Sequence, residues 1–179
     1  MADFDFESLI VDIPDYPSPG VTFKDITPLL ADPQGFQSVI NRITEHFSGM
    51  GITKVVGAEA RGFMVGAPIA YRLGAGFVPA RKAGKLPRET LSQSYALEYG
   101  EDVLEVHADA LTADDKVLIV DDLIATGGTV VAQIQLIEQF GAEVVGLGFL
   151  LELTFLHPQD AVSKVSDLEI FSLVKVDAE

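Results

Sequence analysis

The sequence predicts an α/β fold in which a parallel sheet is flanked by helices. Short apolar segments alternate along the chain with longer segments whose apolar residues recur at helical spacing, and this alternation is typical of βαβ units. Hydrophobic residues make up 48% of the 179 residues, which suits a sheet covered on both faces. The sequence contains no internal repeat and no low-complexity linker, so we predict a single domain over residues 1–179.

The N-terminal part predicts a short helix, a loop and then an amphipathic helix. Residues 3–11 favour the first helix, and the prolines of residues 14–20 predict the loop. Residues 21–30 predict a semi-extended stretch that Pro28 interrupts. The apolar positions of the second helix are three or four residues apart, and they are Phe36, Val39, Ile40, Ile43 and Phe47.

The next part predicts two strands around a helix, followed by a loop and a hairpin. The strands and the helix are expected over residues 54–58, 62–73 and 76–80. Residues 82–93 are polar and contain Gly84 and Pro87, so we predict a mobile loop there. Residues 94–99 and 103–107 alternate in polarity and predict a hairpin across Gly100.

The segment VLIVDDLIATGGT, residues 117–129, carries the strongest functional signal. Its apolar run predicts a buried strand that ends at Asp121 and Asp122, at the sheet edge where open α/β sheets bind ligands. The glycine-containing turn at residues 125–129 and a helix over residues 130–140 would form a phosphate cradle. Two carboxylates would repel a phosphate, so they suit the hydroxyls of a sugar whose phosphate lies in the turn. The alternative is a plain turn with an acidic helix cap.

The last predicted strands cover residues 143–151 and 168–173. The net charge of −15 argues against a nucleic-acid partner or an anionic membrane surface, because both require basic patches. The chain has no cysteine, no apolar run of membrane-spanning length and no signal-peptide pattern, and these features favour the cytoplasm. The three histidines lack the spacing of metal ligands.

Cations are concentrated in one short segment of this acidic chain. Four of the twelve Lys and Arg residues are Arg81, Lys82, Lys85 and Arg88, and such a cluster favours a small polyanion as ligand. Arg61 follows another predicted strand and is a candidate phosphate contact, or else a surface arginine.

Two further residues have both a functional and a structural interpretation. A partly desolvated Glu98 would suit proton transfer, although its segment is equally compatible with a plain hairpin. Phe23 follows a rigid turn and would suit stacking on a base, whereas its residue type alone favours the core.

Five motifs together resemble the type I phosphoribosyltransferases, and their order and spacing match the adenine-specific branch of that family. They are PGVTFKDITP, EARGF, RKAGKLP, SYALEYG and VDDLIATGGT, and the similarity spans residues 12–153. The resemblance implies a Rossmann-like fold with a small N-terminal hood over residues 1–35, which binds the base, and a flexible catalytic loop over residues 81–100. It implies a pentosyltransferase of purine salvage that converts adenine and 5-phospho-α-D-ribose 1-diphosphate to AMP and diphosphate.

The resemblance also implies the roles of the candidate residues. The base would be bound by Thr22, Phe23, Lys24 and Leu153. The diphosphate would be bound by Arg61, Arg81, Lys82, Lys85 and Tyr99. The ribose 5-phosphate would be bound by Asp121, Asp122, Ala125, Thr126, Gly127, Gly128 and Thr129. The catalytic residues would be Glu98, as proton carrier, together with Asp121 and Asp122.

Family members require Mg²⁺, so we expect this cofactor, held mainly through the substrate and without a direct protein ligand. A homodimer is the expected assembly, in which Lys82 and Lys85 would contact the diphosphate in either their own site or the partner's. Two alternatives remain open at this point. One is a phosphoribosyltransferase for another purine base, although residues 143–151 lack the lysine that oxopurine enzymes generally use. The other is a ligand-sensing regulator without catalysis.

Overall fold

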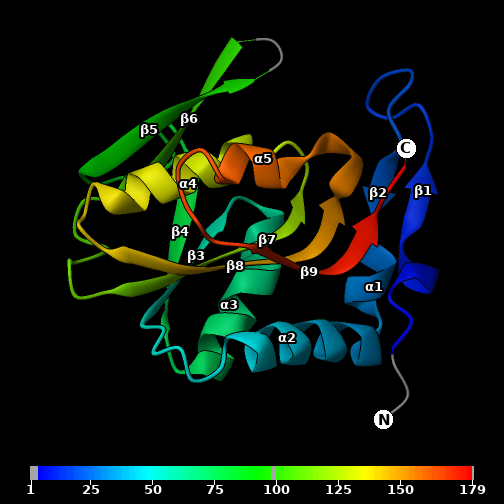
Figure 1. The fold of residues 1–179 in the computed structure, drawn as a ribbon, viewed down its shortest axis with the longest axis horizontal. Helices are drawn as coiled ribbons and strands as arrows, with labels where there is room; N and C mark the ends of the chain where they lie inside the picture. Colours follow the sequence, from blue (N-terminus) through cyan, green and yellow to red (C-terminus); the bar gives the residue numbers. More distant parts are fainter. Residues whose placement is uncertain (1–3, 98–99, 179) are drawn as a thin grey trace.

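The computed structural model describes residues 4–97 and 100–178, and a seven-stranded, mostly parallel sheet runs through the molecule (Figure 1). Its strand order is β5-β6-β4-β3-β7-β8-β9. The parallel strands are β3 (Lys54–Ala58), β4 (Gly76–Lys82), β7 (Lys116–Ile124), β8 (Glu143–Leu153) and β9 (Ile170–Val176). The antiparallel hairpin of β5 (Thr90–Leu97) and β6 (Gly100–His107) extends the β4 edge. The predicted fold class is confirmed.

Helices cover both faces of this sheet (Figure 1). One face carries α2 (Pro33–Phe47) and α3 (Arg61–Leu73), and the other carries α4 (Gly128–Glu138) and α5 (Pro158–Val162). Each layer encloses its own cluster of buried apolar side chains. The predicted stripe of α2 is confirmed, since four of its five apolar residues are buried. Asp32 caps α2, and its carboxylate accepts the Gly35 N–H at 2.6 Å.

The N-terminal segment differs from the prediction. Residues 4–11 do not form an α-helix; they contain one 3-10 turn, η1 (Glu7–Leu9), and the start of strand β1 (Val11–Ile13). β1 pairs antiparallel with β2 (Phe23–Asp25), and a short helix α1 (Thr27–Ala31) follows. Val11, the last residue of the predicted helix, pairs with Asp25 in this ribbon, and at this end the distant strand partner outweighs a weak local helix propensity. β1 and β2 form a separate ribbon beside the end of β9 (Figure 1).

The hairpin is longer than its sequence pattern suggested. Residues 90–93 were predicted as part of a loop, but they belong to β5, whose pairing with β6 begins at Thr90 opposite His107. Leu91 packs against the core while Ser92 is exposed, so the segment has the alternation of a half-covered strand. Its polar composition concealed this pattern, and only the partner strand β6 reveals it.

The topological switch point of the sheet lies between β3 and β7. From β3 the chain crosses to β4 on one side, and from β7 it crosses to β8 on the other, so a crevice opens at the carboxyl ends of these two strands. The pairing of β3 with β7 ends at Val56 opposite Ile119, whereas β7 continues to Ile124. The last residues of β7 therefore border the crevice. No helix within the described residues is long and apolar enough to cross a membrane.

Candidate active site

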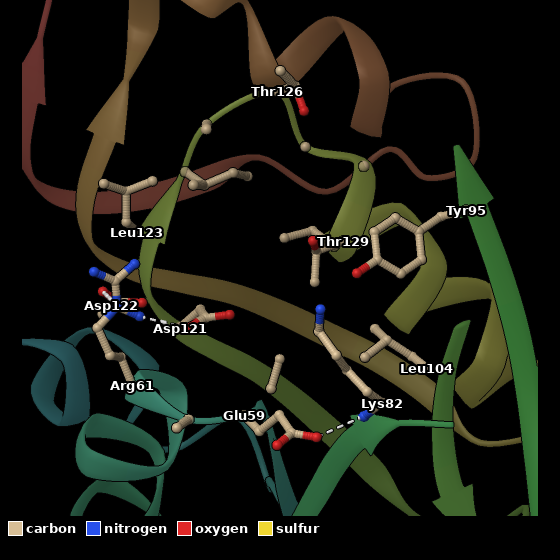
Figure 2. Close-up of a pocket in the computed structure, with 17 residues that line it drawn as sticks. Glu59, Arg61, Lys82, Tyr95, Leu104, Asp121, Asp122, Leu123, Thr126 and Thr129 are labelled. Atoms are coloured by element: carbon tan, nitrogen blue, oxygen red, sulfur yellow. Dashed lines mark hydrogen bonds and ion pairs between the residues drawn. The ribbon is translucent and has the colours of Figure 1, made fainter. Parts of the chain in front are cut away.

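A cavity of about 260 Å³ occupies the crevice at the switch point (Figure 2). One wall is the turn from Glu59 to Arg61 that follows β3, and another is the end of β7 with the loop after it. Lys82 of β4 and Tyr95 of β5 close the opposite side. The structure thus brings together the predicted candidates Arg61, Lys82, Asp121, Asp122, Ala125, Thr126, Gly127, Gly128 and Thr129.

The acid pair lies inside β7 rather than after it. The apolar run was expected to end at the acids, but β7 continues three residues beyond Asp121, to Ile124, and the loop begins at Ala125. The strand continues because its neighbour β8 supplies partners, with Leu123 opposite Leu151 and Ile124 opposite Glu152. The carboxylates are therefore held by a rigid strand.

The two carboxylates have different surroundings. Asp122 is only 4% exposed, and its Oδ2 lies 2.9 Å from Nε of Arg61, so its charge is compensated. Asp121 forms no such ion pair among the described residues; its Oδ1 accepts the backbone N–H of Asp122 at 2.9 Å. Burial first, and then the charge of Asp122, raise the pKa of Asp121 well above its ordinary value. A cationic ligand would favour the ionised form of this carboxyl group.

The loop after β7 leads into α4 without an acidic side chain that caps the helix. Gly127 is the N-cap residue of α4 with φ +86°, and no side chain caps the helix. A Cβ at this position would lie 3.0 Å from the carbonyl oxygen of Pro158, so both the turn and the close approach of α5 require glycine. The alternative of an acidic cap is therefore wrong. The free N–H groups at the start of α4 suit a phosphate.

Glu59 fixes the end of β4 opposite the acids. Its Oε1 accepts the backbone N–H of Lys82 at 2.7 Å, and its Oε2 lies 3.1 Å from a terminal nitrogen of Arg81. These two donors, Lys82 first and then Arg81, lower the pKa of Glu59. Arg81 does not line the cavity and so lies behind it, while the side chain of Lys82 reaches in (Figure 2).

The basic cluster is largely paired with acids. Lys82 pairs with Asp102 at 2.8 Å, Arg81 pairs with Glu59, and Arg88 pairs with Asp109. Asp102 raises the pKa of Lys82 through a hydrogen bond and its charge. Lys85 is exposed in the turn after β4 and does not line the cavity. The segment therefore carries less free positive charge than its composition indicated.

The candidate base-binding residues lie beside the cavity rather than within it. The ring of Phe23 lies 5.3 Å from the guanidinium carbon of Arg61 and contacts Tyr16 edge to face. Phe23 is half-buried and belongs to neither apolar core cluster, so it is not an ordinary core residue. Thr22 directly precedes β2, whereas Leu153, the last residue of β8, packs against the core on the α2 and α3 face.

Lys24 faces a different environment. Its ammonium pairs with Asp12 at 2.8 Å and lines a separate cavity of about 290 Å³. Glu98 and Tyr99 lie outside the described residues. Glu59 and Tyr95 also line the cavity, although neither was a candidate site residue in the sequence. Glu59 directly follows β3, and this position in the sequence could have identified it as a cavity residue. Tyr95 can be identified as one only from the structure, in which β5 lies over α4.

Known proteins resemble this chain over nearly its full length. The family model described as the phosphoribosyl transferase domain matches residues 26–175. The adenine phosphoribosyltransferase of Solidesulfovibrio magneticus is 56% identical over 156 residues, which are 87% of this chain and 91% of that protein. The crystal structure of adenine phosphoribosyltransferase from Thermoanaerobacter pseudethanolicus matches with a TM-score of 0.90 and 48% identity, over 96% of this chain and 98% of that one.

A third match is the structure of a complex with a small molecule. The APRTase from Giardia lamblia, crystallised as a complex with 9-deazaadenine, has a TM-score of 0.92 and 37% identity, and the match covers 97% of both chains. High similarity thus extends across the hood segment, the hairpin and the switch-point crevice.

We expect the substitution Asp121→Asn to stabilise the ligand-free protein at neutral pH. The pKa of Asp121 in the fold lies above its ordinary value of 3.8, so the folded state binds this proton more tightly than the unfolded state does. The stability of the wild type therefore falls as the pH rises from 3.8 through the raised pKa. Asparagine has no charge to bury and keeps an oxygen for the Asp122 N–H.

The gain in stability of Asp121→Asn over the wild type should be complete at pH values above the raised pKa of Asp121 and should vanish as the pH falls toward 3.8. Thermal unfolding of both proteins at a series of pH values measures it. A variant that is less stable than the wild type at neutral pH would contradict the assignment of the raised pKa to Asp121.

Proposed function

The chain belongs to the phosphoribosyltransferase family, and we infer that it is an adenine phosphoribosyltransferase, a pentosyltransferase of purine salvage. It transfers the ribosyl 5-phosphate of 5-phospho-α-D-ribose 1-diphosphate to adenine and releases AMP and diphosphate. The observation that carries this conclusion is the cavity, where an acid pair, an uncapped helix start and two cations meet, in a chain 56% identical to a named enzyme of this activity. Adenine and the ribosyl donor are therefore its substrates.

We propose that the 5-phosphate binds at the start of α4. The N–H groups after Gly127 and the hydroxyl groups of Thr126 and Thr129 supply donors there, and the helix dipole favours the anion. Asp121 and Asp122 would then accept the ribose hydroxyls. As the bond to diphosphate breaks, the ribosyl ring gains positive charge, and two carboxylates held on a rigid strand stabilise that charge.

We propose that Arg61 and Lys82 contact the diphosphate directly, because their side chains line the cavity. Arg81 does not line the cavity and would act through its ion pair with Glu59. Lys85, in the turn after β4, and Tyr99 would complete the diphosphate site. Cations that face the departing diphosphate stabilise its growing negative charge and so lower the barrier.

For the base, we propose stacking on Phe23, whose ring already lies against Arg61, with Leu153 on the opposite face. Backbone groups of Thr22 and Lys24 would recognise the base edge. The side chain of Lys24 is engaged by Asp12, so the main chain is the part of this residue that remains for such recognition.

We propose that Mg²⁺ is held mainly by oxygens of the donor. Mg²⁺ at phosphate sites takes one or two carboxylates together with substrate oxygens. Asp121 lines the cavity and has no cationic partner among the described residues, and Asp122 lies next to it. These observations support a metal that arrives with its substrate, and it would offset the charge of the diphosphate.

The acceptor is tested with a panel of bases. Adenine, hypoxanthine, guanine and xanthine are each supplied with the donor and Mg²⁺, and diphosphate release is measured. We expect turnover with adenine and at least about 100-fold less with the oxopurines, because a site built to hydrogen-bond one base edge leaves groups unpaired with another. Removal of Mg²⁺ by a chelator should stop turnover. Equal rates with adenine and hypoxanthine would reject adenine specificity, and full activity without Mg²⁺ would reject the cofactor.

We propose that Glu98 carries the proton at the base. Glu98→Leu should then lower kcat by about 100-fold or more while leaving KM for the donor within about twofold, because proton transfer acts in the transition state and not on donor binding. Glu89→Leu is the matched control, since Glu89 is exposed in the same segment. An unchanged kcat in Glu98→Leu would exclude the proton-carrier role.

We propose a homodimer in the cytoplasm. Met64 and Tyr71 on α3 are 51% and 85% exposed and lie seven positions apart, hence on one side of the helix, which supports an apolar contact with a second copy. Sedimentation velocity should show a dimer for the wild type and for Tyr71→Phe, and a shift toward monomer for Tyr71→Glu. A monomeric wild type would refute the dimer, and recovery outside the cytoplasm on cell fractionation would refute the location.

A further inference from the structure

Asp102 of β6 lies behind the cavity, where two side chains of the cavity wall meet its carboxylate. Its Oδ2 is 2.8 Å from Nζ of Lys82, and the hydroxyl of Tyr95 donates to the same oxygen at 3.3 Å. Its Oδ1 accepts the N–H of Val103 at 2.9 Å, which fixes the plane of the carboxylate. Asp102 itself does not line the cavity, whereas Lys82 and Tyr95 do.

The sheet register sets this arrangement. Tyr95 stands directly opposite Asp102 in the β5–β6 ladder, and Lys82 stands opposite Leu104 in the β4–β6 ladder. Three neighbouring strands therefore contribute one residue each. Tyr95 also packs against the apolar core under α4, so its ring is fixed and its hydroxyl stays beside the Asp102 carboxylate. Figure 2 shows the Lys82 amine between the Tyr95 ring, Thr129 and Asp121.

Two acids thus hold the two ends of Lys82. Glu59 accepts its backbone N–H at 2.7 Å, and Asp102 accepts its ammonium. Lys82 and Asp102 are both charged at neutral pH, because the Lys82 ammonium lowers the pKa of Asp102 while Asp102 raises the pKa of Lys82. A lysine side chain that is 61% exposed would otherwise sample many rotamers, and the contact with Asp102 restricts that freedom before a ligand binds.

The geometry indicates that Asp102 holds Lys82 ready for an anionic ligand and does not compete with that ligand for the ammonium. An ammonium has three N–H donors, and Asp102 takes one of them from outside the cavity, so the other two are available to an anion inside. We propose that Asp102 is a positioning residue, which holds the Lys82 ammonium in the cavity of its own chain, ready for the diphosphate of the ribosyl donor. This inference rests on the function proposed above.

Kinetics of Asp102→Ala and Asp102→Asn test the proposal. In Asp102→Ala, we expect KM for the donor and the inhibition constant of diphosphate to rise about tenfold, the usual order for one lost charge-assisted contact. Asp102→Asn keeps the shape and a hydrogen-bond acceptor, so its effect should be smaller. Inhibition by AMP should stay at the wild-type level in both variants, because AMP carries the 5-phosphate but no diphosphate.

A double-mutant cycle shows whether Asp102 acts through Lys82. In a Lys82→Ala background, Asp102→Ala should add nothing to the rise in the donor KM, since the group that it positions is gone. Asp109→Asn is the matched control, because it also breaks an ion pair with a cation of the basic cluster, Arg88, and neither of these residues lines the cavity. This control should retain the wild-type constants.

Several outcomes would overturn the proposal. Two of them are an unchanged donor KM and tighter diphosphate binding in Asp102→Ala. A third is additivity of Asp102→Ala and Lys82→Ala in the double-mutant cycle. The fourth is an equal loss of AMP and diphosphate affinity in Asp102→Ala, which would indicate collapse of the hairpin. Asp102→Asn decides the question if the alanine variant does not fold. Failure of the wild type to use adenine would refute the proposed function instead, and the two failures are therefore distinguishable.

Discussion

The ion pair between Arg61 and Asp122 connects the parts of the molecule on which the site depends. It joins the first residue of α3 to the C-terminal part of β7 across the switch point, at 2.9 Å. The same guanidinium lies over the ring of Phe23 and so links the N-terminal ribbon to the sheet. This cation compensates the charge of Asp122 directly. Asp121 has no such ion pair among the described residues, and burial together with the charge of Asp122 raises its pKa.

Opposing charges are arranged in pairs throughout the crevice. Glu59 and Asp102 hold cations of the β4 segment, Asp122 holds Arg61, and Asp121 is left without a cationic partner among the described residues. This pattern fits a ligand with both anionic groups and a carbon that becomes cationic during the reaction. The protein compensates its own charges before binding, and the remaining imbalance at Asp121 is the one that the reacting ribosyl ring would relieve.

Much of the fold follows from local patterns. The strand over residues 54–58 was predicted to the residue, and the stripe of α2 identified its buried face, because both are continuous segments with one dominant period. The N-terminal helix and the loop over residues 82–93 were predicted less well. Residues 90–93 of the predicted loop belong to β5 through pairing with β6, and Val11, at the end of the predicted N-terminal helix, belongs to β1 through pairing with β2. Such pairing has no signal in the segment itself.

The sequence by itself determined the segment that we propose binds the ribosyl donor, because the apolar strand, the two acids and the glycine turn are contiguous, and chain connectivity alone brings them together. It also determined that cations gather before the hairpin. Only the tertiary structure decided how these charges act. Asp122 meets Arg61 and Lys82 meets Asp102 because strands distant in the chain become neighbours in the sheet. Phe23 meets Arg61 because the separate ribbon of β1 and β2 lies beside that sheet. Coulomb and stacking interactions depend on distance in space, and that distance is set by sheet order and register rather than by position along the chain.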